Sequence, residues 1–447
     1  MRPFIFLAAL IGVVSAAPSR PMVPRGTLTP KGFTIVDPGG IKDVEVTFNN
    51  TLNGTIHDNS THTATRRATT ANLPLKFVNN FSGSSVNAYI SGLDSAGAVV
   101  FVGADGSLIY PSSGGSGVPV PITQNLAIPI STKGQTLEFT LPIEMSSGRI
   151  YFVEGELTFY MVSTGTGDGL VQPSVTNLQD ASAGLNWGFV EFTYTNGVLY
   201  ANISYVDFVG IILGMFLSVN DGSSQSAYGL QEGSVSKICN DLVSQNSDGF
   251  PWSSMCIANS AGTPVRVLSP NDYNDINPDA FANYWSTYVD DVWTKYSSQT
   301  LTINTQTDAG NVACRVSGDV LSCDGDNRSY AKPSAKDIWG CNSGPFGFLD
   351  GDNAIHYAVV PRLCAAFVRS TLLIDGGDTQ PSLGQDSYYA VNPTNHYSRI
   401  VHNYESDGKG YAFAYDDVNP DGNENASGTV SSGNVGSLTV YIGAPPS

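Results

Sequence analysis

Two carboxylates in a short apolar segment have the residue types and surroundings for acid–base chemistry. The segment is WGFVEFTYTNGVLYANISYVDFVG, residues 187–210, where Glu191 and Asp207 each stand between a valine and a phenylalanine. No Lys or Arg occurs in the sequence between Arg149 and Lys237. Hydrolysis of a glycosidic bond needs a protonated acid at the leaving oxygen and a second carboxylate, which attacks the sugar or activates a water. A poorly solvated carboxyl group without a nearby cation has a raised pKa and keeps its proton, so this pair is a candidate for glycoside hydrolysis.

On spacing alone, a structural interpretation of the two acids is favoured, in which each points to solvent from the outer face of a half-exposed sheet. The Asn196-Gly197 pair between two strand-like runs predicts a tight hairpin. The residue opposite Glu191 is then near 201 or 202, and Asp207 lies about five residues further along, roughly 17 Å away at strand rise. An inverting pair needs about 6.5–9.5 Å. Catalysis therefore requires that the second strand bends around ISYVD, or that the connection is wider than the Asn-Gly signal suggests.

Other catalytic and metal-binding patterns are weak in this sequence. The histidines at 356, 396 and 402 are not accompanied by a G-x-S-x-G motif, so a serine or cysteine hydrolase is not expected. DVNPDGNEN matches the first half of a calcium loop, but Gly428 stands where the loop requires Glu. The sequence contains no C-x-x-C pair, so a zinc site is not expected. We expect no metal and no cofactor.

The elements that position the two acids are mainly strands. From Leu73 to about Val219, short apolar runs alternate with Gly, Ser, Asn and Pro, a pattern typical of a sandwich or barrel. Helical patterns begin near Gln231: one helix is predicted from an N-cap at Asn277, with its aromatic residues packed in a core, and another from Pro361. The C-terminal GYAFAYDDV and GSLTVYIGA return to strands.

This order predicts two domains. Residues 68–230 with 405–447 are expected to form a catalytic β-barrel or sandwich domain, and residues 231–404 a mixed α/β domain inserted into it. All six cysteines fall in the second half of the chain. An even number in a secreted chain predicts disulfides, with 15 possible connectivities. Proximity favours the pairs Cys239–Cys256, Cys314–Cys323 and Cys341–Cys364.

The N-terminal residues and the net charge of the sequence indicate a secreted protein. Residues 1–17 have the early Arg, short apolar run and small residues of a signal peptide, and no later run is long enough to span a membrane. The net charge of −18 argues against nucleic acid and suits a neutral polysaccharide. We expect an extracellular monomer that can associate with a cell wall. Sequons, which suggest a glycoprotein, begin at Asn49, Asn53, Asn59, Asn80, Asn202, Asn327 and Asn425.

Residues 18–67 differ in composition from the rest of the chain. They are rich in Thr, Asn and Pro and end in the pair Arg66-Arg67. A protease that cuts at dibasic sites would leave a mature start near Ala68, which makes this segment a propeptide; the alternative is a disordered, glycosylated arm.

Several motifs in order resemble glycoside hydrolase family 64, the β-1,3-glucanases related in fold to thaumatin. They are GRIYFVEGELTF, GLVQPSVTNLQD, the segment 187–210, RVLSP, DIWGCNSGPF, RLCAAFVRSTLL, GYAFAYDDV and GSLTVYIGA, and the resemblance covers about Leu73 to Ile442. It implies a thaumatin-like β-barrel or sandwich domain, a mixed α/β domain and a wide acidic groove between them. It also implies endo-acting, inverting cleavage of β-1,3-glucan that releases short laminari-oligosaccharides such as the pentaose.

The resemblance assigns roles to residues in two motifs. Glu191, in W-G-F-x-E-F-T, corresponds to the general acid, and Asp207, in N-I-S-x-V-D-F-V, to the general base. Thr193 and Trp187 are candidate sugar contacts, although Trp187 is equally compatible with a core aromatic. The alternative function is a thaumatin-like glucan-binding or antifungal protein without turnover. The sequence departs from the family pattern by its acids in VEGEL and by an Ile-Ile pair in FVGIILG.

Overall fold

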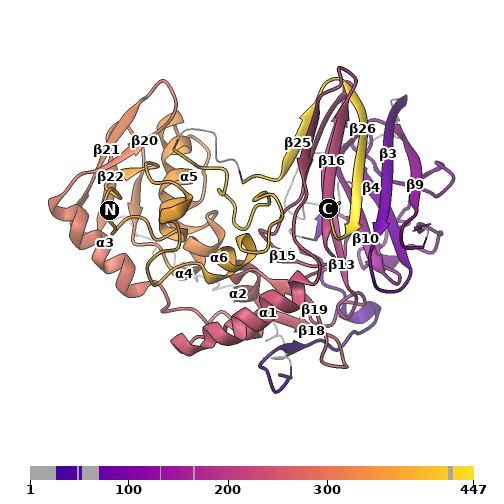
Figure 1. Cartoon of the computed structure of the whole chain (residues 1–447), viewed down its shortest axis with the longest axis horizontal. Coiled ribbons are helices and arrows are strands. Elements are labelled where there is room, and N and C mark those ends of the chain that lie inside the picture. Colours follow the sequence, from indigo (N-terminus) through magenta and orange to yellow (C-terminus); the bar gives the residue numbers. More distant parts are fainter. Residues whose placement is uncertain are drawn as a thin grey trace, which may run out of the picture.

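The computed structural model describes residues 27–47, 50–52, 70–130, 132–164, 167–420 and 426–446. The suggested signal peptide and the Arg66-Arg67 pair lie outside these residues, as does part of the calcium-like loop. The described chain is mainly β, with a strand-rich lobe and a helix-rich lobe joined by a smaller sheet and short helices (Figure 1).

Two sheets form most of the strand-rich lobe. The eight-stranded sheet has the order β25-β14-β13-β10-β4-β5-β6, with β8 beside β4, and the five-stranded sheet has the order β17-β16-β26-β3-β9. Other strands of the first sheet are β4 (Val86–Leu93), β5 (Val99–Val102), β6 (Leu108–Ile109) and β8 (Ile128–Pro129), and the edges of the second are β17 (Ser224–Ala227) and β9 (Thr136–Ile143). The strands of the first sheet that matter below are β10 (Met145–Glu154), β13 (Trp187–Thr195), β14 (Val198–Asn202) and β25 (Thr429–Ser432). Apolar side chains on alternate positions of these strands are buried, which explains why the period-two pattern of the sequence is a reliable strand signal.

The C-terminal strand completes the second sheet, as the sequence indicates. β26 (Val435–Gly443) lies between β3 (Thr70–Asn80) and β16 (Leu213–Val219). It pairs in parallel with β3 and antiparallel with β16. The two ends of the family-like region are thus hydrogen-bonded to each other, so the sheet closes only when the whole chain has been made.

The helix-rich lobe has a second five-stranded sheet, in the order β23-β22-β21-β20-β24, covered by helices. Its strands include β23 (Ser329–Ala331), β20 (Leu301–Asn304) and β24 (Thr379–Gln380). The longest helices of this lobe are α3 (Ser286–Ser298) and α5 (Ala354–Val368). Two further helices, α1 (Ser234–Gln245) and α6 (His396–His402), lie nearer the strand-rich lobe. The aromatic residues expected to pack in a core are buried: Phe281, Tyr284, Trp285, Tyr288 and Tyr296.

Both predicted helix starts are wrong. Asn277 ends α2 (Pro270–Ile276), whose true N-cap is Ser269, and the next helix begins only at Ser286. Asn277 precedes a proline, and the residue before a proline is disfavoured in the helical region. Pro361 lies inside α5, which starts after Asn353, whose side chain accepts a hydrogen bond from the His356 amide.

The three predicted disulfides are confirmed. Cys239–Cys256 ties α1 to β18 (Cys256–Ala258), and Cys314–Cys323 joins the neighbouring strands β21 (Asn311–Ser317) and β22 (Val320–Cys323). Cys341–Cys364 ties the end of α4 (Ala335–Gly340) to α5. No helix within the described ranges is long and apolar enough to cross a membrane.

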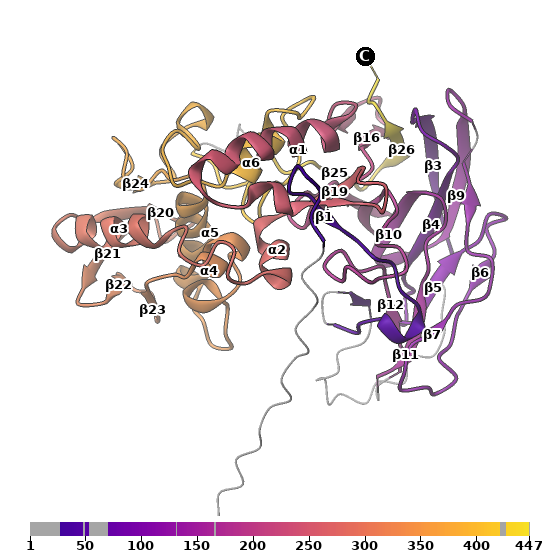
Figure 2. The same ribbon diagram turned by 90° about the horizontal axis from the view of Figure 1, so that it is seen from below.

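Part of the segment interpreted as a propeptide or disordered arm is packed on the body of the protein. β1 (Thr34–Ile35) pairs in parallel with β18, and β2 (Thr51–Leu52) pairs antiparallel with β12 (Asp168–Val171). The indigo segment of Figure 2 runs from β1 to the neighbourhood of β12. Residues 27–47 and 50–52 thus contact the rest of the protein through two short strands.

Candidate active site

Glu191 lies on the more exposed face of β13, where it lines a pocket. The burial of β13 alternates, so that Val190 and Phe192 face the core while Glu191 and Thr193 face the pocket. The pocket has a volume of about 400 Å³, and the Glu191 side chain is 37% exposed. Its lining includes residues of four strands and one loop: Arg149, Gln172, Glu191, Thr193, Tyr200, Asn202 and Thr429.

Arg149 is the direct partner of Glu191, which contradicts the expectation that no cation lies near. The two residues are opposite each other in the β10–β13 ladder. Arg149 Nη2 lies 2.9 Å and Nε 3.2 Å from Glu191 Oε1, while Nη1 donates to Gln172 Oε1 at 3.1 Å. Its guanidinium also lies 4.3 Å from the centre of the Phe189 ring. The expectation was wrong because strand pairing supplies the cation from 42 positions earlier in the chain.

The flat hairpin ends where the sequence predicts that it has to bend. β13 and β14 pair only as far as Glu191 and Asn202. The chain then leaves the ladder, and the Tyr205 amide donates to the Tyr411 carbonyl at 2.7 Å. It returns to the start of β13, where the Ile211 amide donates to the Trp187 carbonyl at 3.2 Å. Asp207 lies on this detour and not on a continuation of the flat ladder.

Asp207 lines a second pocket, of about 310 Å³, between the two lobes. Arg149 borders both pockets. The Asp207 backbone is fixed by its carbonyl, which accepts from the Ser269 amide at 2.7 Å, and by β15 (Phe208–Val209), which pairs with β19 (Pro264–Leu268). The residue remains exposed to solvent along the pocket wall.

The electrostatics link the two acids. Partial loss of hydration within the pocket raises the pKa of Asp207; the charge of Arg149 lowers it and the charge of Glu191 raises it. Asp207 is an exposed residue, so water still reaches its carboxyl group. The three side chains therefore belong to one electrostatic unit, although they line two pockets.

Asp272 is a site residue that the sequence did not reveal. It lies in the first turn of α2, lines the Asp207 pocket and is 6% exposed. Burial raises its pKa well above the usual value, and the charges of Asp207 and Asp275 raise it further. The signal that was available is the Ser269-Pro270 helix start, which places an acid in the first turn of a helix directly after β19.

The two predicted sugar contacts lie in different environments. Thr193 lines the Glu191 pocket beside Tyr200, whose side chain is 57% exposed and which the sequence analysis missed. Trp187 is 1% exposed. Its ring centre lies 4.9 Å from that of Phe208 and 5.3 Å from the Arg266 guanidinium. Trp187 thus forms the core side of the Asp207 pocket wall, which agrees with its interpretation as a core aromatic.

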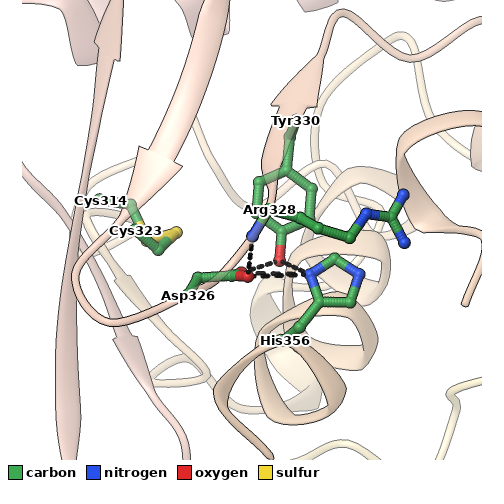
Figure 3. The surroundings of a disulfide bond; sticks show 6 residues. All are labelled: Cys314, Cys323, Asp326, Arg328, Tyr330 and His356. Atoms are coloured by element: carbon green, nitrogen blue, oxygen red, sulfur yellow. Dashed lines mark hydrogen bonds and ion pairs between the residues drawn. A yellow bond between two sulfur atoms is a disulfide. The ribbon is translucent and has the colours of Figure 1, made fainter. Parts of the chain in front are cut away.

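A separate polar cluster lies beside the Cys314–Cys323 disulfide (Figure 3). His356 Nδ1 is 2.9 Å from the Tyr330 hydroxyl and 3.1 Å from Asp326 Oδ1, and the His356 and Asp326 side chains are fully buried. This arrangement fixes the loop after β22 to α5. It presents no nucleophile to solvent, so it does not form a hydrolase triad. In the part of the chain that the structure describes, no group of three or more His, Cys, Asp or Glu residues is arranged to hold a metal.

Known proteins resemble this chain in sequence and in fold. Two curated proteins named glucan endo-1,3-beta-glucosidase, from Cellulosimicrobium cellulans and from Arthrobacter sp. (strain YCWD3), are each 28% identical over 359 residues. The match covers 78% of this chain but spans only 62% of the length of either relative.

Solved structures extend the similarity to the fold. A laminaripentaose-producing β-1,3-glucanase, solved in complex with laminaritetraose, superposes with a TM-score of 0.73 at 28% identity, covering 83% of this chain and 99% of that one. A β-1,3-glucanase domain from Clostridium beijerinckii has the same fold, with a TM-score of 0.64 at 21% identity over 85% of this chain and 100% of that domain. Residues 71–442 match the family model described as β-1,3-glucanase. The chain therefore belongs to glycoside hydrolase family 64.

Proposed function

We propose that this protein is a secreted, endo-acting β-1,3-glucanase that cleaves β-1,3-glucan with inversion and releases short laminari-oligosaccharides. The observation that carries the proposal is the convergence of Glu191 and Asp207 around Arg149 on adjoining pockets. Family membership supports the reaction class. The thaumatin-like barrel, the wide groove between the domains 68–230 with 405–447 and 231–404, and the monomeric state belong to the same proposal.

In this mechanism Glu191 protonates the glycosidic oxygen while Asp207 removes a proton from a water that attacks the opposite face of the sugar. The solvent exposure of Asp207 suits this role, because a general base has to hold its water at the reacting carbon. Thr193 and the exposed Tyr200 ring flank Glu191 and offer a hydroxyl and an apolar face to sugar units.

One observation favours the reverse assignment of roles. The ion pair with Arg149 stabilises the ionised form of Glu191, whereas a general acid has to carry a proton. Aryl laminariosides with a dinitrophenolate leaving group separate the assignments, since such a leaving group departs without protonation. The Glu191→Gln variant retains turnover of this substrate if Glu191 is the acid. The Asp207→Asn variant retains it if the roles are reversed.

Release of reducing ends from laminarin tests the function. Glu191→Gln and Asp207→Asn are each expected to lower the rate at least about 100-fold, because each removes a proton-transfer group while keeping its shape. Glu154→Gln is the matched control: it changes an acid of the neighbouring strand β10 that lines neither pocket and accepts hydrogen bonds from Ser84.

The outcomes distinguish an enzyme from a binding protein. Near-normal rates in either carboxylate variant would refute the assignment of that residue. Binding of laminarin by the wild-type protein without release of reducing ends would instead support the glucan-binding or antifungal alternative. The two carboxylates beside an arginine favour the enzyme, since glucan binding alone requires no such pair.

A further inference from the structure

The ordered part of the N-terminal arm lies outside the region that defines the family. The family match begins at residue 71, whereas the structure describes residues 27–47 and 50–52 in contact with the body. Any function of this arm is therefore additional to the family domain.

The arm is anchored by buried contacts at its start. Phe33 and Val36 are 4% and 2% exposed, and the Thr34 hydroxyl donates to the Ser254 carbonyl at 2.7 Å. β1 extends the sheet β1-β18-β19-β15, whose last strand directly follows Asp207. The arm is thus an integral part of the sheet that fixes the Asp207 backbone.

Its end lies beside both candidate catalytic acids. Thr47 and Asn50 line the Asp207 pocket, and Thr51 with Leu52 lines the Glu191 pocket. Asn50 holds the turn between them: its Oδ1 accepts from the Thr47 amide at 2.8 Å and its Nδ2 donates to the Glu45 carbonyl at 2.8 Å.

The arm also reaches the ion pair at the centre of the site. The Asn50 carbonyl accepts from the Gln172 amide at 2.8 Å, and the Gln172 side chain accepts from Arg149. The arm borders the two pockets as a wall and does not fill them, because both pockets retain their volume and the Glu191 side chain is 37% exposed. The four arm residues that line the pockets are uncharged, as suits a neutral sugar.

We propose that Thr47 and Leu52 are specificity-determining residues that bind sugar units of a β-1,3-glucan on either side of the scissile bond. The inference rests on the proposed function and deepens it, because it adds a wall from residues that lie outside the family match. Loss of one such hydroxyl or apolar contact weakens binding by about 3- to 10-fold.

The test measures binding and turnover separately in the full-length chain. In a Glu191→Gln background, which does not hydrolyse, Thr47→Ala and Leu52→Ala are each expected to raise the dissociation constant for laminarihexaose by about 3- to 10-fold. In the active enzyme the same variants raise KM by a similar factor and change kcat less than about 2-fold. Ile41→Ala, at an arm residue that is 54% exposed and lines neither pocket, is the control and leaves both constants unchanged.

The results that overturn the inference differ from those that overturn the function. Unchanged dissociation constants in both variants, with thermal unfolding like that of the wild type, contradict the sugar-binding wall. Tighter binding or faster turnover in the variants contradicts it too, since the arm would then obstruct the groove. Absence of hydrolysis by the wild-type protein contradicts only the proposed function, because the binding measurement does not depend on it.

Discussion

At the scale of single residues, Asp207 shares its pocket with a buried carboxyl group, Asp272. The charges of Arg149 and Glu191 act on Asp207, and the charge of Asp207 in turn raises the pKa of Asp272. Asp272 itself is surrounded by Asp207, Asp275 and the amide of Asn271. Tyr397 also responds to both acids, with its pKa raised by burial and then by their charges.

Replacement of Asp272 by Asn is expected to leave the acidic limb of the pH–rate profile in place. Burial holds the pKa of Asp272 well above its usual value, so Asp272 is uncharged while Asp207 titrates, and its replacement removes no negative charge from the surroundings of Asp207. The measurement is kcat/KM on laminarin across the acidic range. Asp275→Asn, which removes a surface pair with Lys336, serves as the control. An acidic limb that moves to lower pH in the Asp272 variant would show instead that Asp272 is ionised beside Asp207.

The sequence predicted the two acids but not their neighbours. Glu191 and Asp207 were visible because uncharged runs of strand-like sequence surround them. Arg149 and Asp272 were not, because their proximity depends on the register of β10 against β13 and on the docking of α2 at the end of β19. Local sequence carries no information about either kind of contact until the pairing is known.

At the scale of elements, strands were easier to predict than helix boundaries. Period-two burial in β13 follows directly from its sequence, and a bend after Asn202 was one of the two alternatives that a catalytic pairing of the acids required. The helix starts were missed because two cap signals compete near residues 269 and 277, and packing decides between them. The predicted helix start at Pro361 is wrong because the tertiary contacts of α5 outweigh the one helical hydrogen bond that a proline lacks.

Helix α6 ends in a charged cluster that makes stability depend on pH. His402 Nε2 lies 2.9 Å from Asp416 and Nδ1 lies 3.0 Å from Glu405, while Arg369 also contacts Asp416. Burial alone lowers the pKa of His402, but the charges of Asp416 and Glu405 outweigh it and raise the pKa to about 10.

The free energy of unfolding is therefore expected to fall as the pH rises from about 6.5 towards 10. Below pH 6.5, about the pKa of an unfolded histidine, His402 is charged in both states and its ion pairs stabilise the fold in full. Above it, only the folded protein retains the proton, and the stabilisation is lost as the pH approaches 10. Urea unfolding at pH 6 and pH 9.5 is expected to differ by about 2–4 kcal/mol from this group. A His402→Gln variant with the same pH dependence as the wild type would show that another group is responsible.

At the scale of the whole molecule, the site exists only where the two lobes meet. β13 of the strand-rich lobe supplies Glu191, and the pocket of Asp207 is completed by Asn271, Asp272 and Asn342. The arm joins the two pockets along one side. Sequence patterns identified both kinds of structure and their order, but the junction is produced by long-range sheet pairing and lies beyond what those patterns specify.

The stereochemistry of the first product tests the central claim most directly. Proton NMR of laminari-oligosaccharide hydrolysis reports the anomeric form of each new reducing end before mutarotation equilibrates it. Direct attack by a water that Asp207 activates, opposite a leaving group that Glu191 protonates, predicts that the α-anomer appears first. Initial appearance of the β-anomer would require a covalent intermediate on one of the two carboxylates and would contradict the mechanism.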